Sequence, residues 1–139
     1  MCYNSKCSIE IKSTVDGETS VVSANGKVIK EPSEMRFDYS LDGDECTLTV
    51  TDSEVVQTRR GEHNIKLTFK KGENTECLLG SGLFSGTVSV FTEDFQYSIC
   101  SINKRLGAVH IFMLTLNYML EEQKIKINFS AKFTSRVKK

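Results

Sequence analysis

Apolar and polar residues alternate along most of the chain, in short segments separated by turn-forming residues. The segment 125–133 places Ile125, Ile127 and Phe129 on one face, with polar or charged residues between them. A period of two is typical of a β-strand with one buried face, because no helix gathers those positions on one side. The same alternation marks the segments 7–11, 35–41, 46–50, 65–69, 84–90 and 95–99.

Turn-forming clusters interrupt the chain about every ten residues, which is the spacing of an up-and-down antiparallel β protein. Asn25-Gly26 and Glu93-Asp94 are two of these clusters, and we expect both to separate strands. A meander of this length hides its strand edges best by closing on itself. The pattern therefore predicts an all-β fold, an antiparallel β-barrel of roughly eight to ten strands. We expect one domain over residues 1–139.

The segment 108–120 is apolar on both faces over its first half, and taken alone it also suits a buried helix. Its β-branched and aromatic residues favour a strand. In that strand His110, Phe112 and Tyr118 share the inner face. The outward Val109, Ile111 and Met113 then need cover from another element or another subunit.

Charge and composition exclude several classes of partner. Lys and Arg together number 18, as do Asp and Glu, so no basic surplus exists for binding nucleic acid. The longest apolar stretch, 109–120, is shorter than the roughly 20 residues that span a bilayer. The chain starts without the basic and apolar blocks of a signal peptide. We therefore expect a cytoplasmic protein with neither a nucleic-acid nor a membrane partner.

The five cysteines are odd in number and show no C-x-x-C spacing, which argues against zinc and redox sites. We expect Cys7, Cys46 and Cys100 to be small buried hydrophobes. No nucleophile or phosphate-binding motif is present, so we predict no catalytic residue, no metal and no cofactor. The acidic residues fall in turns, where Asp42 and Asp44 are expected to be solvated.

Two kinds of residue offer polar chemistry to a barrel interior. Arg59 and Arg60 are adjacent, so in a strand one of them faces the lumen or its rim, where it would hold a carboxylate or phosphate. His110 lies on the inner face, where a hydrogen-bonded core histidine is the expected role. The predicted ligand-binding set is Arg59, Arg60, Tyr97, His110, Phe112, Tyr118 and Phe129.

Ordered short motifs cover about half of the chain from Arg59 onward. They are Arg59-x-Gly61, Leu67-x-Phe69-x-x-Gly72, Gly86-Thr87-Val88-Ser89-Val90-Phe91-Thr92, Gly107-x-Val109-x-Ile111 and Leu116-x-Tyr118. In these motifs the chain resembles the YwiB-like family of uncharacterised bacterial proteins. The resemblance implies a calycin-like, lipocalin-related barrel and carries no activity.

Two functions follow from such a barrel. The leading hypothesis is a cytoplasmic protein that binds a small apolar or amphipathic ligand in the lumen, with Arg59 or Arg60 and Tyr118 orienting its polar head. The alternative is a protein-interaction module with a packed core and no ligand, self-associating as a homodimer through Val109, Ile111 and Met113. RNA binding ranks last, because the outward faces carry lysines without interleaved aromatic residues.

Overall fold

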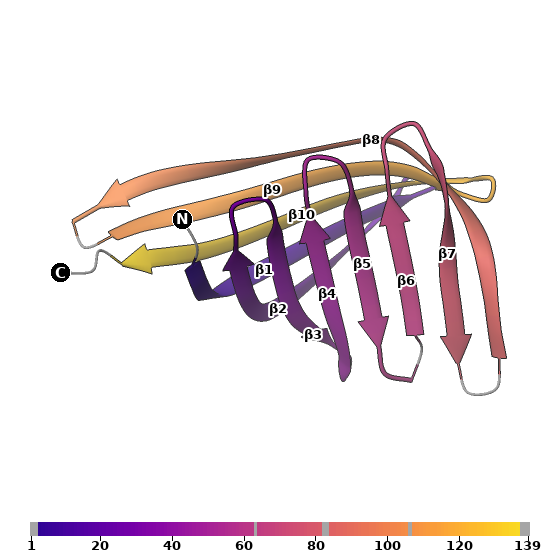
Figure 1. The fold of residues 1–139 in the computed structure, drawn as a ribbon, viewed down its shortest axis with the longest axis horizontal. Coiled ribbons are helices and arrows are strands. Elements are labelled where there is room, and N and C mark those ends of the chain that lie inside the picture. The colour runs from indigo at the N-terminus through magenta and orange to yellow at the C-terminus, as the bar shows by residue number, and fades with distance from the viewer. Residues whose placement is uncertain (1–2, 63, 82–83, 106, 137–139) are drawn as a thin grey trace.

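The described part of the chain is built from strands. A computed structural model describes residues 3–62, 64–81, 84–105 and 107–136. Consecutive strands pair antiparallel, and the first strand also pairs with the last, which closes the barrel (Figure 1). The strands are β1 (Tyr3–Val15), β2 (Glu18–Lys30), β3 (Met35–Leu41), β4 (Asp44–Val50), β5 (Val55–Arg60), β6 (Asn64–Phe69), β7 (Asn74–Ser81), β8 (Phe84–Lys104), β9 (Gly107–Leu120) and β10 (Gln123–Arg136).

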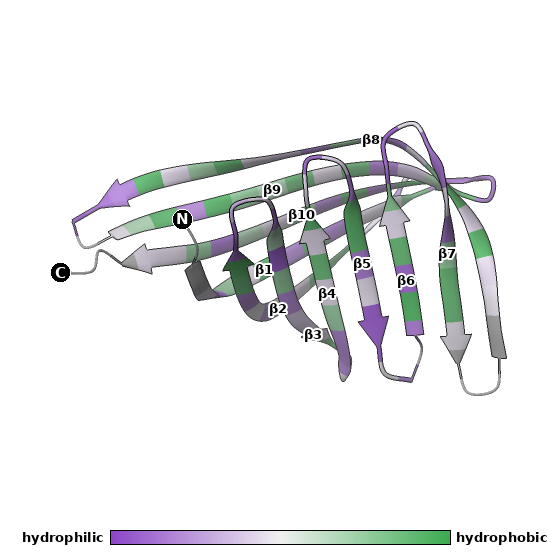
Figure 2. Ribbon diagram, viewed as in Figure 1, coloured by the Kyte–Doolittle hydropathy of each residue, from purple (hydrophilic) through white to green (hydrophobic). Residues whose placement is uncertain are grey.

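This topology confirms the predicted antiparallel barrel, and β9 confirms the strand interpretation of segment 108–120. Within the described ranges, no helix is long and apolar enough to cross a membrane. The hydropathy of the residues alternates along the strands in Figure 2, as the period of two requires.

The strands fall into two groups by length. β1, β2, β8, β9 and β10 have 13 to 21 residues, whereas β3 to β7 have 6 to 8. In Figure 1 the long strands run along the molecule and the short strands run across them. The barrel is therefore flattened into two crossing layers. β2 and β8 belong to both layers, because each pairs with one long and one short strand.

Two of the predicted turns lie inside these two shared strands, so both predictions were wrong. Asn25-Gly26 lies within β2, and Glu93-Asp94 lies within β8. Each marks the place where its strand changes layer, since β2 pairs with β3 from Gly26 onward and β8 pairs with β7 as far as Phe91. The ladder between β8 and β9 also slips between Thr92 and Asp94, and such a bulge bends a strand. Here the turn-forming residues bend the strand and do not end it.

Aromatic rings fill the space between the layers. The ring centroid of Phe37 lies 4.9 Å from that of Phe112 and 5.1 Å from that of Phe129. Each of these side chains is at most 3% exposed. Burying a side chain of this size stabilises a fold by about 1.5–3 kcal/mol. These contacts join strands from both layers, so the core holds the flattened barrel together.

Gly26 lies where β2 begins to pair with β3, tightly packed against that strand. A Cβ atom on this residue would lie 2.2 Å from the carbonyl oxygen of Asp38 and 2.9 Å from the Cβ of Tyr39. Both contacts are with the backbone or the first side-chain atom of a paired strand, so no rotamer change relieves them. Glycine is therefore required at the β2 corner.

We expect Gly26→Ala to lower the free energy of unfolding by about 1–3 kcal/mol, because the added methyl group overpacks the corner. Urea unfolding of the two proteins measures the difference. Asn25→Ala is the matched control, since Asn25 is exposed and adjacent, and its effect is expected within about 0.5 kcal/mol. Equal destabilisation by the two substitutions would contradict this account of the corner.

Candidate functional site

The residues predicted to bind a ligand do not meet in one cavity. Phe112, Phe129 and Tyr118 are buried in the core, and the Tyr118 ring lies 4.7 Å from that of Phe69. The rings of this core touch one another, so a ligand among them would have to displace side chains. The remaining predicted residues lie at the barrel rim or in the part of β8 and β9 that extends past the short strands.

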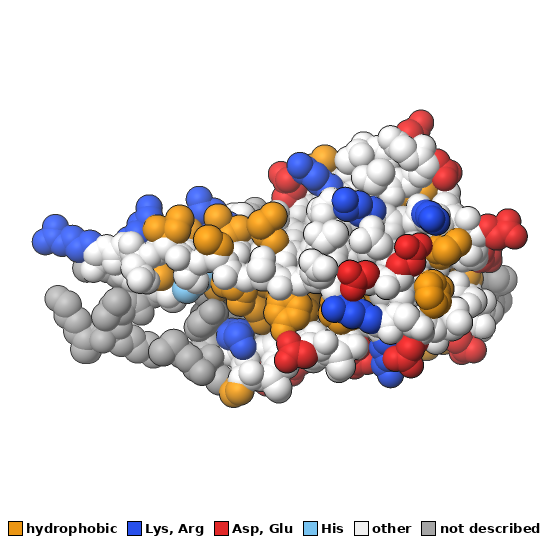
Figure 3. Space-filling model, turned by 90° about the horizontal axis from the view of Figure 1, so that it is seen from above, with side chains coloured by type: hydrophobic (Ala, Val, Ile, Leu, Met, Phe, Trp, Pro, Cys, Tyr) orange, Lys and Arg blue, Asp and Glu red, His pale blue; other side chains and the backbone are white. Residues whose placement is uncertain are grey.

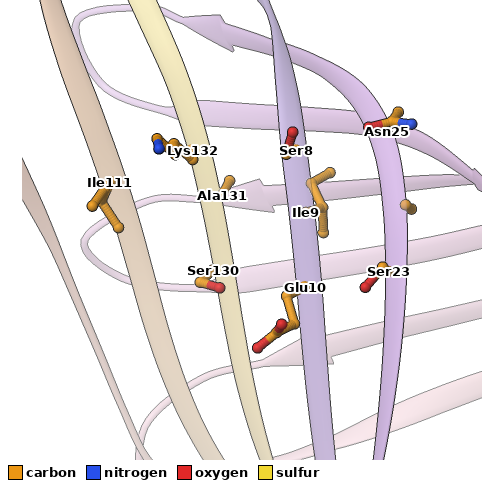
Figure 4. Close-up of a pocket in the computed structure, with 10 residues that line it drawn as sticks. Ser8, Ile9, Glu10, Ser23, Asn25, Ile111, Ser130, Ala131 and Lys132 are labelled. Atoms are coloured by element: carbon orange, nitrogen blue, oxygen red, sulfur yellow. The ribbon is translucent and has the colours of Figure 1, made fainter.

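The surface hollows lie on the outer faces of the sheet. The hollow shown in Figure 4 has a volume of about 440 Å³ and receives Glu10, Ser130 and Lys132. Their neighbours Ile9 and Ala131 are in the core, so these polar side chains point away from the lumen. The hollow shows no converging set of buried polar groups that would orient a small ligand.

Arg59 faces inward at the rim, opposite Cys46 and Ile65, whereas Arg60 is exposed. The Nε of Arg59 donates to Oδ2 of Asp44 at 2.7 Å, and this hydrogen bond raises the pKa of the guanidinium above its ordinary range. The arginine that faces the lumen already has a carboxylate partner from its own chain. It is an end-of-barrel structural residue in this geometry.

Asp44 is 7% exposed, so the prediction of a solvated turn carboxylate was wrong for this residue. Its Oδ1 accepts the backbone N–H of Glu62 at 3.3 Å. A Cβ atom on Gly61 would lie 1.9 Å from that same oxygen. The turn after β5 therefore leaves room for the carboxylate, and the sequence signal for this arrangement is the Arg59-x-Gly61 spacing.

His110 joins three long strands through its two ring nitrogens. Nδ1 lies 2.7 Å from Oγ of Ser101 on β8, and Nε2 lies 2.8 Å from Oγ of Ser135 on β10. The ring also packs 5.1 Å from that of Phe133. His110 is therefore hydrogen-bonded as predicted, but it is half-buried and lies outside the buried core.

β8 continues past the short strands and leaves one of its edges open. Residues Asp94–Lys104 pair with β9 on one side. On the other side, no strand of the described chain pairs with them. We call Asp94–Lys104 the β8 edge. Only the first residues of the β8 edge pack into the core. The Phe95 side chain is 2% exposed, whereas that of Tyr97 is already 38% exposed.

Two turns of the short strands hold the beginning of the β8 edge. Lys71 lies 3.6 Å from Asp94 and over the ring of Phe95. The Tyr97 hydroxyl donates to Asp52, and that carboxylate raises the pKa of the phenol. These contacts fix the direction in which β8 leaves the barrel.

Apolar side chains are exposed on both faces of the β8 edge. Ile99 is 37% exposed on the inner face, and Ile102 is 53% exposed on the outer face. On the neighbouring strand Met113 is 56% exposed, whereas Val109 and Ile111 are half-buried. Figure 3 shows hydrophobic side chains gathered on this narrow end of the molecule. Cys100 is exposed on the β8 edge, so its predicted burial was wrong, while Cys7 and Cys46 are buried as predicted.

Sequence reasoning missed the β8 edge as a site. It placed Phe95, Tyr97 and Ile99 on an inner face correctly and expected a barrel wall beyond them. One signal was present: the stretch from Phe95 to Asn103 contains no charged residue and no proline. Natural edge strands usually carry such residues because these discourage pairing with other chains.

Burial makes the core sensitive to alkali. It raises the pKa of Tyr118 from 10.0 to about 12, and that of Cys7 from 9.0 to about 11. Both groups are stable in the folded state as neutral forms, and both ionise at lower pH in the unfolded chain. Their stabilising contribution is complete below about pH 9 and is lost as the pH rises toward 11–12.

We expect Tyr118→Phe to reduce the stability loss between pH 10 and pH 12, because the phenylalanine has no proton to release. When fully lost, this contribution of Tyr118 amounts to roughly 3 kcal/mol. Urea unfolding of both proteins at pH 8, 10 and 11 measures the difference, with pH 8 as the internal control. Parallel pH profiles for the two proteins would contradict the assignment to Tyr118.

The fold and one large segment of the sequence match known proteins. The crystal structure of the ywiB protein from Bacillus subtilis has a TM-score of 0.70 at 15% sequence identity, over 95% of this chain and 94% of that one. At this identity the likeness shows the fold alone. A search of curated proteins gives no match. Residues 6–131 match the family model described as a domain of unknown function, DUF1934. The chain therefore belongs to the DUF1934 family.

Proposed function

We propose that this protein is an interaction module that binds a partner strand along the β8 edge. The observation that carries the proposal is the ladder side of Asp94–Lys104 that the barrel leaves open. An open strand edge presents a row of backbone donors and acceptors, which is the template that β-augmentation uses. The proposal corresponds to the packed-core alternative of the sequence analysis. It moves the interaction surface from Val109, Ile111 and Met113 on β9 to the β8 edge.

The residues around the β8 edge support strand addition. Apolar side chains on both faces, Ile99 inside and Ile102 outside, would be covered by an added strand and by the side chains it carries. The uncharged stretch from Phe95 to Asn103 offers no like-charge barrier to a partner. The hydrogen bond from Tyr97 to Asp52 anchors the beginning of the edge to the turn between β4 and β5.

A luminal ligand has less support from the geometry. The ring contacts of Phe37, Phe112 and Phe129 occupy the interior that the ligand hypothesis requires. Arg59, the residue that would hold a polar head group, is paired with Asp44. The polar groups of the lumen therefore serve the fold.

The proposal places the module in the cytoplasm. The described cysteines Cys7, Cys46, Cys77 and Cys100 are all free. Reducing compartments keep cysteines in this state.

Ile99→Lys tests the β8 edge, because a charge in the middle of an edge strand opposes an added apolar strand. The tagged protein is recovered from the cells that naturally make it, and co-purifying chains are quantified, an untagged copy of this protein included. We expect wild type to retain a partner and Ile99→Lys to lose it by tenfold or more. Val21→Lys is the matched control, since Val21 is 55% exposed on β2, and it is expected to behave as wild type.

Far-UV circular dichroism and thermal unfolding confirm that both lysine variants are folded before the comparison is made. Equal retention of a partner on Ile99→Lys and on wild type would contradict the proposal. So would the release of one equivalent of a small molecule from the purified protein, seen by native mass spectrometry, together with loss of that molecule on substitution of Phe112.

A further inference from the structure

We infer that the strand added to the β8 edge is the same edge of a second copy of this chain, paired antiparallel about a two-fold axis at Ile99. The inference rests on the proposed function and names its partner. It would join the long layer of one copy to the long layer of the other as one continuous sheet.

The register follows from the limits of the edge. At one end, the backbone of Thr92 is already hydrogen-bonded to Gly72 and Glu73 of the turn between β6 and β7. At the other end, β8 stops at Lys104. In a continuous sheet, residues that face each other across a ladder point to the same face, and Ile99 is the midpoint of Asp94–Lys104. A two-fold axis at Ile99 therefore pairs every residue of the β8 edge. It also places the inner faces of the two copies on the same side of the joined sheet.

The ends of this pairing are complementary in charge. With the axis at Ile99, Asp94 of one copy lies opposite Lys104 of the other, and the symmetry repeats the contact at the far end. They are the only charged residues from 94 to 104. Asp94 also lies 3.6 Å from Lys71, with about half of each side chain exposed, so its carboxylate remains accessible to a second cation. A one-step slip of the register loses both ion pairs.

The middle of the pairing is apolar. Ile99 meets its own copy on the inner face, next to Tyr97, and both side chains are more than a third exposed in the single chain. On the outer face Ser98 lies opposite Cys100. An antiparallel ladder of this length supplies about ten backbone hydrogen bonds, the number of direct hydrogen bonds found in a typical specific interface.

Symmetry favours this pairing over a mixed one. β2 also leaves an edge open, because its residues before Gly26 have no partner on the β3 side in the described chain. Pairing β8 with β2 would be heterologous and would leave a free edge on each copy, so copies would continue to add until a ring closes or a filament forms. Pairing β8 with itself uses the edge of both copies at once and closes as a dimer.

Size-exclusion chromatography with light scattering, over a range of protein concentrations, tests the second copy. We expect wild type and Val21→Lys at twice the chain mass of 15.6 kDa. Ile99→Lys is expected at the single-chain mass, because the two lysines would face each other on the axis. A wild-type protein that stays at 15.6 kDa at every concentration overturns the inference, and so does a dimer that Ile99→Lys leaves intact.

Disulfide trapping tests the register. In Ile99→Cys/Cys100→Ser the new cysteines lie opposite each other on the axis, so oxidation with copper phenanthroline is expected to link two chains. Cys100→Ser alone is the background control for the other cysteines. Cys100 of wild type lies opposite Ser98 and is expected to cross-link several-fold less than the Ile99→Cys variant. A stronger cross-link through Cys100 would overturn the axis at Ile99.

The two proposals fail in different ways. A monomeric wild type whose Ile99-dependent partner in cells is a different protein removes the second copy and leaves the interaction module standing. A monomeric wild type whose partners are indifferent to Ile99→Lys removes both.

Discussion

The fold depends on a mismatch in length between strands that must share hydrogen bonds. β8 has 21 residues, and its neighbour β7 has 8. The backbone donors and acceptors of a strand are all paired within a sheet only where a neighbouring strand lies on each side of it. The barrel therefore closes along the first part of β8 and opens along the rest. The glycine corner in β2 and the bulge in β8 are the two places where the long layer parts from the short one.

The packing of the interior decides where chemistry is available. The core is filled by rings from both layers. Two inward polar groups have partners within the chain, Arg59 with Asp44 and His110 with two serines. The longest open ladder edge of the described chain lies along β8. Membership of the DUF1934 family and the likeness to the ywiB protein support this architecture, and the relation to lipocalins stays a prediction.

Alternation alone predicted the inner faces well, because a strand allows only two choices for each side chain. Phe37 and Phe129 lie in the core as expected, and the segment 108–120 is a strand. The failures are long-range. Asn25-Gly26 and Glu93-Asp94 have turn propensity, but whether they end or bend a strand depends on partners distant in sequence. Cys100 alternates outward and is exposed because no described strand pairs with β8 on its open side there. The open edge arises because β8 is longer than β7. A local sequence pattern does not show this difference, because it depends on which strands pair.

The open ladder is the central claim, and residue-resolved amide hydrogen exchange of the wild-type protein tests it most directly. Between Asp94 and Lys104, the amides that face away from β9 alternate with those that face it. If a second copy occupies the edge, both sets exchange slowly at high protein concentration, and the outward set becomes fast on dilution below the dissociation constant. Fast exchange of the outward set at every concentration would show an edge that no copy covers. Slow exchange of both sets in a protein that stays monomeric would show that the ladder is closed within the chain, and the account would be wrong.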